Sequence, residues 1–454
     1  MIRKLLIANR GEIAVRIIRA CREMGIATVA VYSEADEESL HTQLADEAIC
    51  IGPGPSAQSY LNMEQIISAT MVSGADAIHP GFGFLSENAR FAELCEKCGI
   101  TFVGPPSKVI RMLGNKKIAR STMIAAGVPV VPGSEGDVED IETGLKEAER
   151  IGYPVIIKAA LGGGGKGMRV ANTPEEFPEA YATARKESEI AFGDGTMYIE
   201  HFVVNPRHIE FQILADSFGN VIHLGERDCS IQRNHQKMIE ESPSAAVSPE
   251  LREKMGHAAV TAAKAAGYVN AGTIEFLLEP DGKFWFMEMN TRIQVEHPVT
   301  EWVTGIDLVK EQLKIASRMP LEIAQEDVRI QGHAIECRIN AENPQKNFRP
   351  SPGTIQGAHF PGGNGIRVDT CVYNGCKIPP YYDSMLAKLI VHAGNRKEAI
   401  AKMQSALGEV IIDGIDTNID YQYEILKDED YQSGNFDTGF LASHIIAGVK
   451  INEN

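Results

Sequence analysis

The sequence has no apolar run long enough to cross a membrane and no cysteine pattern typical of a disulfide or zinc framework. Met1 to Lys4 lead into only four apolar residues, fewer than the ~7–15 of a signal-peptide core. The eight cysteines are scattered, and the close pairs Cys95–Cys98 and Cys371–Cys376 lack a second ligand cluster at zinc spacing. We therefore expect reduced, buried thiols and a cytoplasmic protein without membrane contact.

Positive charge is also scarce. The 454 residues contain 44 Lys and Arg against 61 Asp and Glu, a net charge of −17. Such a chain repels a polyphosphate backbone, which argues against nucleic-acid binding, so any phosphate ligand must be held by local cations. With 44% hydrophobic and 23% charged residues the composition is globular, and the length predicts two to four folding units.

Two nucleotide-binding fingerprints are incomplete. Asn9-Arg10-Gly11-Glu12 has one glycine where a dinucleotide fingerprint needs three, and in Gly81–Ser86 a serine replaces the last glycine. A P-loop is excluded as well, because Ala160 and Gly167 occupy the places of its first glycine and its Ser or Thr. We reject both a nicotinamide site and a P-loop.

The first 114 residues alternate strands and helices in the manner of an open parallel α/β domain. We expect strands over 5–8, 28–32, 76–80 and 100–104, and helices over 12–24 and 87–97. A helix over 116–126, a strand over 154–158, a hairpin over 273–290, a helix over 305–318 and strand-rich sequence over 333–392 follow.

An apolar strand leads into Leu161 to Met168, which contains five glycines and one lysine. Without side chains in the way, the backbone N–H groups of such a run can approach phosphate oxygens. Lys158 and Lys116 could neutralise triphosphate charge, although a lone lysine is more often solvated on the surface. A flexible linker is the alternative, and the lysine flanked by strands favours a nucleotide-binding loop.

The stretch from Glu226 to Lys237 is dense in hydrogen-bond donors. It contains Arg227, Gln232, Arg233, His235, Gln236 and Lys237. Donors at this density suit a ribose and phosphates, and a salt-bridged surface loop is the alternative.

Two strand-like runs over 273–279 and 284–290 predict a hairpin with paired carboxylates. A four-residue turn at 280–283 pairs Glu279 with Phe284 and places Glu275 opposite Glu288. Facing like charges need a cation between them, and hard oxygen ligands favour Mg²⁺. Two solvated glutamates on an exposed sheet are the alternative.

The same two-residue alternation continues past Glu288 through Asn290, Arg292, Gln294 and Glu296. Arg292 and Gln294 suit a small oxyanion, and Glu296 suits a general base. Eight residues of straight strand would separate Glu296 from Glu288 by about 26 Å, so we expect the chain to curve here. A structural ion pair is the alternative interpretation.

Several stretches resemble the signatures of biotin carboxylase. They are Asn9–Ala14, His79–Asn88, Gly162–Gly167, Glu226–Ser230 and Glu288–Pro298, together with Arg338 in Glu336–Asn340 and Pro350–Gly353. They extend over nearly the whole chain, and as a set they are highly specific. The chain is therefore similar to the biotin carboxylase family of ATP-grasp enzymes.

This resemblance implies a multidomain fold of the α/β and α+β classes. It has an N-terminal open parallel α/β domain, a mobile glycine-rich lid and a C-terminal mixed-sheet region. The implied parts are a Rossmann-like domain (1–114), a helical linker (115–130), the ATP-grasp lid (131–203), the ATP-grasp catalytic domain (204–330) and a C-terminal biotin carboxylase domain (331–447).

The resemblance also implies residue roles. The ATP-binding set is Lys116, Lys158, Gly162, Gly163, Gly164, Gly165, Lys166, Gly167, Glu200 at the adenine hinge, Val203, His208, Gln232, His235, Lys237, Glu275 and Glu288. Mg²⁺ or Mn²⁺ is implied on Glu275, Glu288 and Asn290, and bicarbonate on Arg292, Gln294 and Val295. Glu296 is the implied base, and Arg338 stabilises the biotin enolate. One departure is His201, where many relatives carry lysine.

The implied activity is ATP- and bicarbonate-dependent carboxylation of biotin on a carrier protein, the first half-reaction of acetyl-CoA carboxylase. The sequence has no Met-Lys-Met tripeptide of the kind that carries biotin. We therefore expect a separate biotin carboxyl carrier protein, carboxyltransferase subunits and a homodimer. Another ATP-grasp ligase or a non-catalytic nucleotide sensor is the alternative, and Arg292, Glu296 and Arg338 argue against both.

Overall fold

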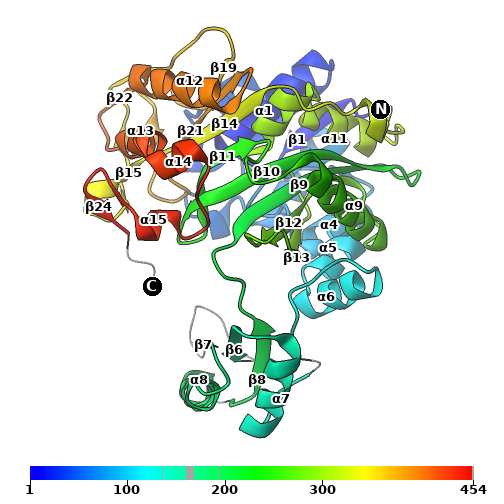
Figure 1. The fold of residues 1–454 in the computed structure, drawn as a ribbon. Coiled ribbons are helices and arrows are strands. Elements are labelled where there is room, and N and C mark those ends of the chain that lie inside the picture. Colours follow the sequence, from blue (N-terminus) through cyan, green and yellow to red (C-terminus); the bar gives the residue numbers. More distant parts are fainter. Residues whose placement is uncertain (135, 160–167, 193, 452–454) are drawn as a thin grey trace. The chain divides into compact units, whose positions relative to one another are not determined.

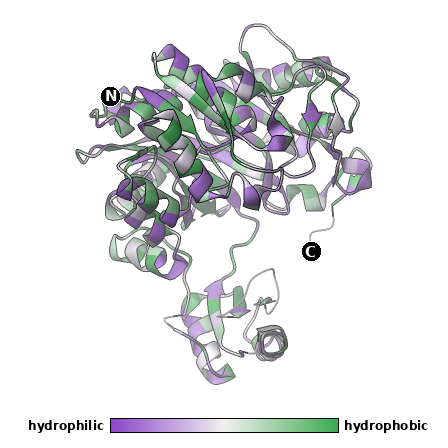
Figure 2. Cartoon of the chain, turned by 180° about the vertical axis from the view of Figure 1, so that it is seen from behind, coloured by the Kyte–Doolittle hydropathy of each residue, from purple (hydrophilic) through white to green (hydrophobic). Residues whose placement is uncertain are grey.

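The computed structural model describes residues 1–134, 136–159, 168–192 and 194–451 (Figure 1). The chain forms two compact units. The first contains Met1–Val128, Arg207–Phe276 and Glu288–Asn454, and the second contains Pro129–Pro206 with Leu277–Met287. Both units consist of elements that mix hydrophobic and hydrophilic residues along their length (Figure 2), as expected for elements with one buried face.

The N-terminal part of the first unit is a parallel sheet in the order β3-β2-β1-β4-β5. Its strands are β1 (Lys4–Ile7), β2 (Ala27–Tyr32), β3 (Glu47–Cys50), β4 (Ala77–His79) and β5 (Thr101–Phe102). Leu5, Leu6 and Ile7 are completely buried, because strands of such a sheet are covered on both faces. The predicted open parallel α/β domain is confirmed.

The first unit also contains most of an eight-stranded sheet in the order β13-β12-β9-β10-β11-β14-β21-β19. Its strands are β9 (Arg207–Ala215), β10 (Val221–Arg233), β11 (Gln236–Ser242), β12 (Asn270–Leu278), β13 (Phe284–Asn290), β14 (His333–Asn340), β19 (Ile366–Thr370) and β21 (Met385–Ala393). Strand β14 alternates strictly: Ile335 and Cys337 enter an apolar core, so Glu336 and Arg338 point to the opposite face. That second face carries the ionisable residues of the site.

Helices cover this unit. They are α1 (Gly11–Glu23), α2 (Leu40–Leu44), α3 (Met63–Ser73), α4 (Ala89–Lys97), α5 (Ser107–Leu113), α6 (Lys116–Ala125), α9 (Pro249–Ala265), α10 (His297–Thr304), α11 (Leu308–Ala316), α12 (Arg396–Glu409), α13 (Ile419–Lys427), α14 (Glu429–Ser433) and α15 (Phe440–Ser443). The helix predicted over 305–318 is shorter, because Gly305 ends α10 in the left-handed region and Asp307 caps the start of α11.

The second unit is a three-stranded antiparallel sheet with two helices. Its strands, in the order β7-β6-β8, are Met168–Ala171, Val155–Ala159 and Met197–His201. Helices α7 (Ile141–Ile151) and α8 (Phe177–Phe192) pack on the sheet around a core of their own. A separate core supports the prediction that this part is a small unit in its own right.

The cysteines of the chain are all free thiols. Burial is as predicted for Cys21, Cys95, Cys229, Cys337 and Cys376, whereas Cys50 and Cys98 are exposed. Among the described residues, no helix has both the length and the apolar character needed to span a bilayer.

The contact of α9 with β10 gives a test of packing in the first unit. A methyl group on Gly256 would lie 2.4 Å from the imidazole of His223, which itself packs edge-on against Phe211 with ring centroids 5.5 Å apart. We expect Gly256→Ala to lower the free energy of unfolding by about 1–3 kcal/mol through overpacking.

The matched control is Gly408→Ala in α12, where the added methyl meets nothing within 4 Å. It should raise the free energy of unfolding by about 0.5–1 kcal/mol, because alanine is the better helix former. Urea unfolding of both variants measures the two effects. Equal changes of the same sign would show that the α9 contact is not tight.

Candidate active site

A largely buried ammonium, that of Lys237, lies at the centre of the ionisable face. The Nζ atom of Lys237 on β11 is 2.6 Å from Glu210, 2.6 Å from Glu296 and 3.1 Å from Glu275. Burial by itself lowers the pKa of this lysine, but the surrounding acidic groups outweigh it and raise the pKa well above its ordinary value. Lys237 is therefore a permanent cation that holds three carboxylates together.

Glu296 lies between two cations. One of its oxygens contacts Lys237, the other lies 3.0 Å from the guanidinium of Arg338, and the side chain is fully buried. Burial raises the pKa of Glu296, yet Lys237 and Arg338 together bring it well below its usual value. The residue is thus held as a carboxylate, the form that a general base requires.

Glu275 on β12 contacts three further groups. His208 is 3.0 Å away, the Asn290 amide 2.8 Å and the Gln294 amide 2.9 Å. Burial opposes ionisation of Glu275, but Lys237 and His208 lower its pKa far below the ordinary value. Predicted nucleotide, metal and bicarbonate residues therefore meet at this one carboxylate.

The pKa of Glu288 is shifted in the opposite direction to that of Glu275. Although the residue as a whole is exposed, the chain around its carboxyl group displaces part of the water there, and this desolvation raises the pKa of Glu288. Glu275 raises it further, while Lys116 at the start of α6 lowers it. Two carboxylates that repel each other beside the oxygen-bearing amide of Asn290 form a donor set that a hard divalent cation would stabilise. Among the described residues His208, Glu210 and Glu275 also bring ligand atoms within 4.8 Å, but this set includes a nitrogen, which Mg²⁺ disfavours.

The hairpin that carries these glutamates differs from its prediction. The backbone N–H of Glu279 donates to the carbonyl of Lys283, and its carbonyl accepts from Gly282, whose φ is +87°. The turn is thus a three-residue loop ending in a left-handed glycine, so the predicted four-residue turn and the pairing of Glu279 with Phe284 are wrong. Alternation also breaks in β13, where the neighbouring residues Met287 and Glu288 are both exposed.

The chain beyond β13 curves instead of staying extended. The strand ends at Asn290, and Glu296 is the residue that precedes the first turn of α10. The predicted curvature is confirmed, whereas a continuous extended face through Glu296 is wrong. Arg292 within this curve donates to Glu87 at 3.0 Å, Asn290 at 3.2 Å and Gln294 at 2.8 Å.

Arg338 is shared between two acids. It contacts Glu240 at 2.5 Å and Glu296 at 3.0 Å, and both carboxylates are fully buried. Burial raises the pKa of Glu240 to about 7, although Arg338 acts to lower it. Sequence reasoning missed Glu240, Glu210 and Glu87. Glu210 could have been found because it lies two residues from His208 on one strand, and Glu87 because it belongs to the His79–Asn88 motif. No comparable signal pointed to Glu240.

The donor-rich stretch 226–237 has two different parts. Arg227 is completely buried and bonds Glu210, Gln212, Thr273 and Thr300, so this guanidinium is structural and is not available to a phosphate. Gln232 pairs with Lys237 across a tight turn formed by Asn234 and His235. The turn residues are exposed, and this end of the hairpin remains a candidate for ligand binding.

The second unit holds the remaining predicted nucleotide residues. Lys158 on β6 pairs with Glu200 on β8, and Val203 follows that strand. His201 lies 3.6 Å from Glu279, which also accepts the indole N–H of Trp285 at 2.6 Å. The predicted loop residues Gly162, Gly163, Gly164, Gly165, Lys166 and Gly167 lie outside the described residues.

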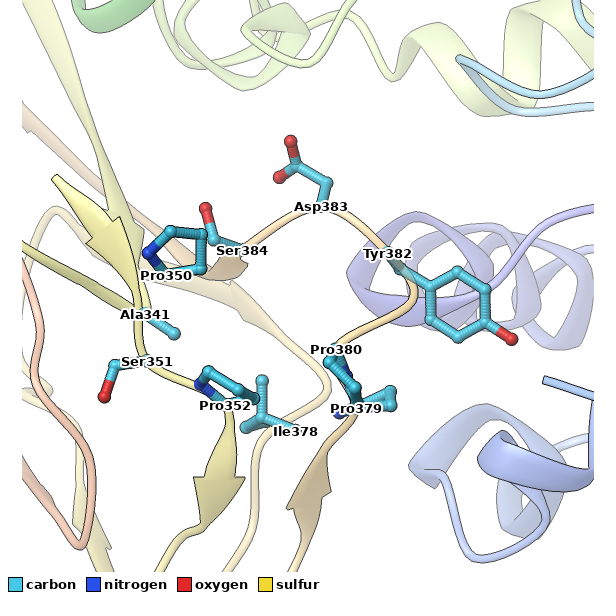
Figure 3. A pocket seen from close by; sticks show the side chains of 10 residues that line it. All are labelled: Ala341, Pro350, Ser351, Pro352, Ile378, Pro379, Pro380, Tyr382, Asp383 and Ser384. Carbon is cyan, nitrogen blue, oxygen red and sulfur yellow. The ribbon is translucent and has the colours of Figure 1, made fainter. Parts of the chain in front are cut away.

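A pocket of about 260 Å³ in the first unit is a different kind of site (Figure 3). Prolines, Ala341, Ile378, Tyr382 and two serines line it, and its only acid is Asp383. No lysine or arginine lines it, so this pocket does not suit a phosphate or a bicarbonate ion.

Comparison with known proteins agrees with this geometry. Family models match residues 1–110 (biotin carboxylase, N-terminal domain), 115–324 (carbamoyl-phosphate synthase L chain, ATP binding domain) and 336–443 (biotin carboxylase C-terminal domain). Biotin carboxylase 1 of Bacillus subtilis is 59% identical over 449 residues, covering 99% of this chain and 100% of the relative.

Two further relatives are named as parts of other carboxylases. A pyruvate carboxylase subunit of Methanothermobacter thermautotrophicus is 54% identical over 441 residues, covering 97% of this chain and 90% of that protein. The biotin carboxylase domain dimer of Hydrogenobacter thermophilus 2-oxoglutarate carboxylase, solved with MgADP, ADP and bicarbonate, has a TM-score of 0.87 at 51% identity, with 98% of each chain covered. The chain belongs to the biotin carboxylase family, and the prediction of an ATP-dependent ligase that carboxylates biotin is confirmed.

The raised pKa of Glu240 predicts a pH-dependent stability. Between about pH 4.5 and 7 the folded state keeps a proton on Glu240 that the unfolded chain releases. Its contribution to stability is therefore present at low pH and lost as the pH rises through about 7. Glutamine cannot ionise, so Glu240→Gln does not lose this contribution as the pH rises. The free energy of unfolding of the variant minus that of the unchanged protein should therefore increase by about 1–3 kcal/mol between about pH 5 and 7.5.

Urea unfolding across this pH range measures how the difference in unfolding free energy changes with pH. Loss of the contact with Arg338 would shift this difference by the same amount at every pH and so would not change its slope. Glu64→Gln on the exposed face of α3 is the control and should show no such slope. A pH-independent difference for Glu240→Gln would contradict the assignment.

Proposed function

We propose that this chain uses ATP and bicarbonate to form carboxyphosphate and then carboxylates biotin on a carrier protein, as the first half-reaction of acetyl-CoA carboxylase. The observation that supports it best is the position of Glu296. This carboxylate lies between Lys237 and Arg338, at the end of the curve that contains Arg292 and Gln294. A base, an anion-binding pair and a cation for a second substrate are thereby next to one another.

The nucleotide set comprises residues of both units. The first unit contains Lys116, His208, Gln232, His235 and Lys237, and the second contains Lys158, Glu200 and Val203. Glu275, Glu288 and Asn290 would hold Mg²⁺ or Mn²⁺. Desolvation raises the pKa of Glu288 and the charge of Glu275 raises it further, and a bound cation would offset both effects. The cation would also supply charge neutralisation for the triphosphate.

Bicarbonate would bind at Arg292, Gln294 and Val295. Arg292 is oriented by Glu87 on one side and by the side-chain oxygen of Gln294 on the other, so the guanidinium is positioned before a ligand arrives. Glu296 would then take the proton from bicarbonate and leave the anion as a nucleophile toward the γ-phosphate.

Arg338 also affects the strength of the base. The cations around Glu296 keep its pKa low, so Glu296 is ionised but is a weak proton acceptor. Biotin bound beside Arg338 before bicarbonate is deprotonated would draw this guanidinium away from Glu296 and so increase the affinity of Glu296 for a proton. In the later step the same guanidinium would stabilise the biotin enolate.

The proposal also covers the pathway that the carboxylated biotin serves and the partner proteins. Relatives with closely similar sequences are named as a biotin carboxylase, as part of a pyruvate carboxylase and as a domain of 2-oxoglutarate carboxylase, and the Hydrogenobacter domain is a dimer. We infer a biotin carboxyl carrier protein and carboxyltransferase subunits as partners, a homodimer, and a cytoplasmic location.

The first test is phosphate release by the purified protein. Release from MgATP should be slow with bicarbonate and faster when free biotin is added, because carboxyphosphate formation requires no other protein. Colorimetric phosphate measurement with bicarbonate-depleted buffer as the control reports the dependence. Equal rates with and without bicarbonate would overturn the proposal.

The second test separates the base from the metal ligand. Glu296→Gln should retain ATP affinity while losing bicarbonate-dependent turnover by about 10²–10⁴-fold, the contribution typical of a general base. Glu288→Gln should instead shift the Mg²⁺ concentration needed for half-maximal activity. If both variants change only the Mg²⁺ requirement, Glu296 is a metal ligand and the separate base is refuted.

A further inference from the structure

A second buried lysine lies on the same sheet face as the site. Lys388 is a fully buried residue of β21, and it is the direct cross-strand partner of Arg338 on β14. Residues that face each other across antiparallel strands project to the same side of the sheet with Cβ atoms about 5 Å apart. Lys388 and Arg338 are therefore neighbouring cations on the face where α10 packs.

The ammonium group of Lys388 has three acceptors around it. Its Nζ donates to the main-chain carbonyl of Val295 at 2.8 Å, lies 3.2 Å from Glu12 and lies 3.9 Å from Asp369. A lysine has three N–H donors, and a charged donor makes a stronger bond to a carbonyl than a neutral one. The Val295 carbonyl is thus fixed by a cation that water does not reach.

This carbonyl belongs to the peptide group that joins Val295 to Glu296. Fixing that peptide plane sets the direction in which the Glu296 side chain leaves the backbone. Arg338 holds the other end of the same residue through the carboxylate, at 3.0 Å. Two adjacent cations of one sheet therefore hold the backbone end and the carboxylate end of one residue.

We propose that Lys388 is a positioning residue for the proposed base, holding the Val295–Glu296 peptide so that Glu296 and the bicarbonate-binding segment keep their geometry. This inference rests on the proposed function. It also assigns a purpose to Glu12 in the Asn9–Ala14 motif. Glu12 is buried, its two carboxylate oxygens accept no hydrogen bond within the described part of the chain, and Lys388 is its close cation.

The test compares Lys388→Met with two matched variants. Glu12→Gln removes the counter-ion but leaves the bond from Lys388 to Val295. Arg396→Met removes a partly buried cation that pairs with Glu241 at 2.8 Å and touches no residue of the 292–296 segment in the described structure. Burial raises the pKa of Glu12 to about 7, so this acid can become neutral when Lys388 is lost, and the Lys388→Met protein is expected to fold.

We expect Lys388→Met to keep the KM for ATP while its kcat/KM for bicarbonate falls about 10²-fold, the cost of displacing a reacting group by ~1 Å. Glu12→Gln and Arg396→Met should retain the bicarbonate kinetics of the unchanged protein. Unchanged bicarbonate kinetics in Lys388→Met would overturn the proposal. So would an equal loss in Glu12→Gln, because docking of α1 would then explain the effect.

Hydrogen exchange decides the question independently of activity. Amides of residues 293–299 should exchange faster in Lys388→Met than in Arg396→Met, and unchanged exchange there would contradict the positioning role. If Lys388→Met fails to fold, the double variant Glu12→Gln/Lys388→Met takes its place, because it leaves no unpaired acid at position 12. Faster exchange of residues 293–299 in the double variant would support the positioning role, and unchanged exchange would contradict it. Absence of bicarbonate-dependent phosphate release from the unchanged protein would count against the proposed function alone, since the exchange measurement still tests Lys388.

Discussion

The contact of Lys237 with Glu210, Glu275 and Glu296 is the interaction on which the site depends. Three acids this close would repel one another strongly, and the loss of their ionised form would remove both a candidate metal ligand and the candidate base. A single buried ammonium resolves this conflict, because it is within hydrogen-bond reach of all three. The arrangement requires strands β9, β11 and β12 in one sheet with α10 packed against β11, so the chemistry and the fold share the same constraint.

A second constraint is the strict alternation of β14. Because Ile335, Cys337 and Ile339 fill an apolar core, the intervening residues Glu336 and Arg338 must point to the ionisable face. The sheet thus presents charge on one side and hydrophobic surface on the other. Apolar packing against α12 fixes the backbone from which Arg338 projects, so the position of this candidate site residue is set by residues outside the site.

Sequence reasoning predicted several helices closely and brought together residues that the structure places near Glu275. Local periodicity located α1, α4 and α6 to within two residues, and two-residue spacing correctly grouped Asn290, Arg292 and Gln294 near Glu275. These features depend on residues close together in the chain, so the sequence pattern can predict them. The division into five domains stays a prediction, and so do the individual ligand roles.

Other features lie beyond a linear pattern. The turn at Pro280–Gly282 depended on whether Gly282 takes the left-handed conformation, and the sequence permits either loop length. The contacts of Glu87 with Arg292, of Glu240 with Arg338 and of Glu12 with Lys388 join residues from distant segments. Only the packing of strands and helices determines which acid meets which cation, and each of these acids could equally have been a solvated surface residue.

The pairing of Glu12 with Lys388 has a consequence for how the protein is made. The two residues belong to the first helix and to a strand near the end of the chain, so the contact cannot form until the ribosome has released most of the polypeptide. Domains fold in order as they emerge during synthesis, and pairings between distant segments form late. A nascent chain that already contains the predicted nucleotide-binding residues therefore still lacks the contact of Lys388 with the Val295 carbonyl, and the segment before α10 gains this contact only after translation of β21.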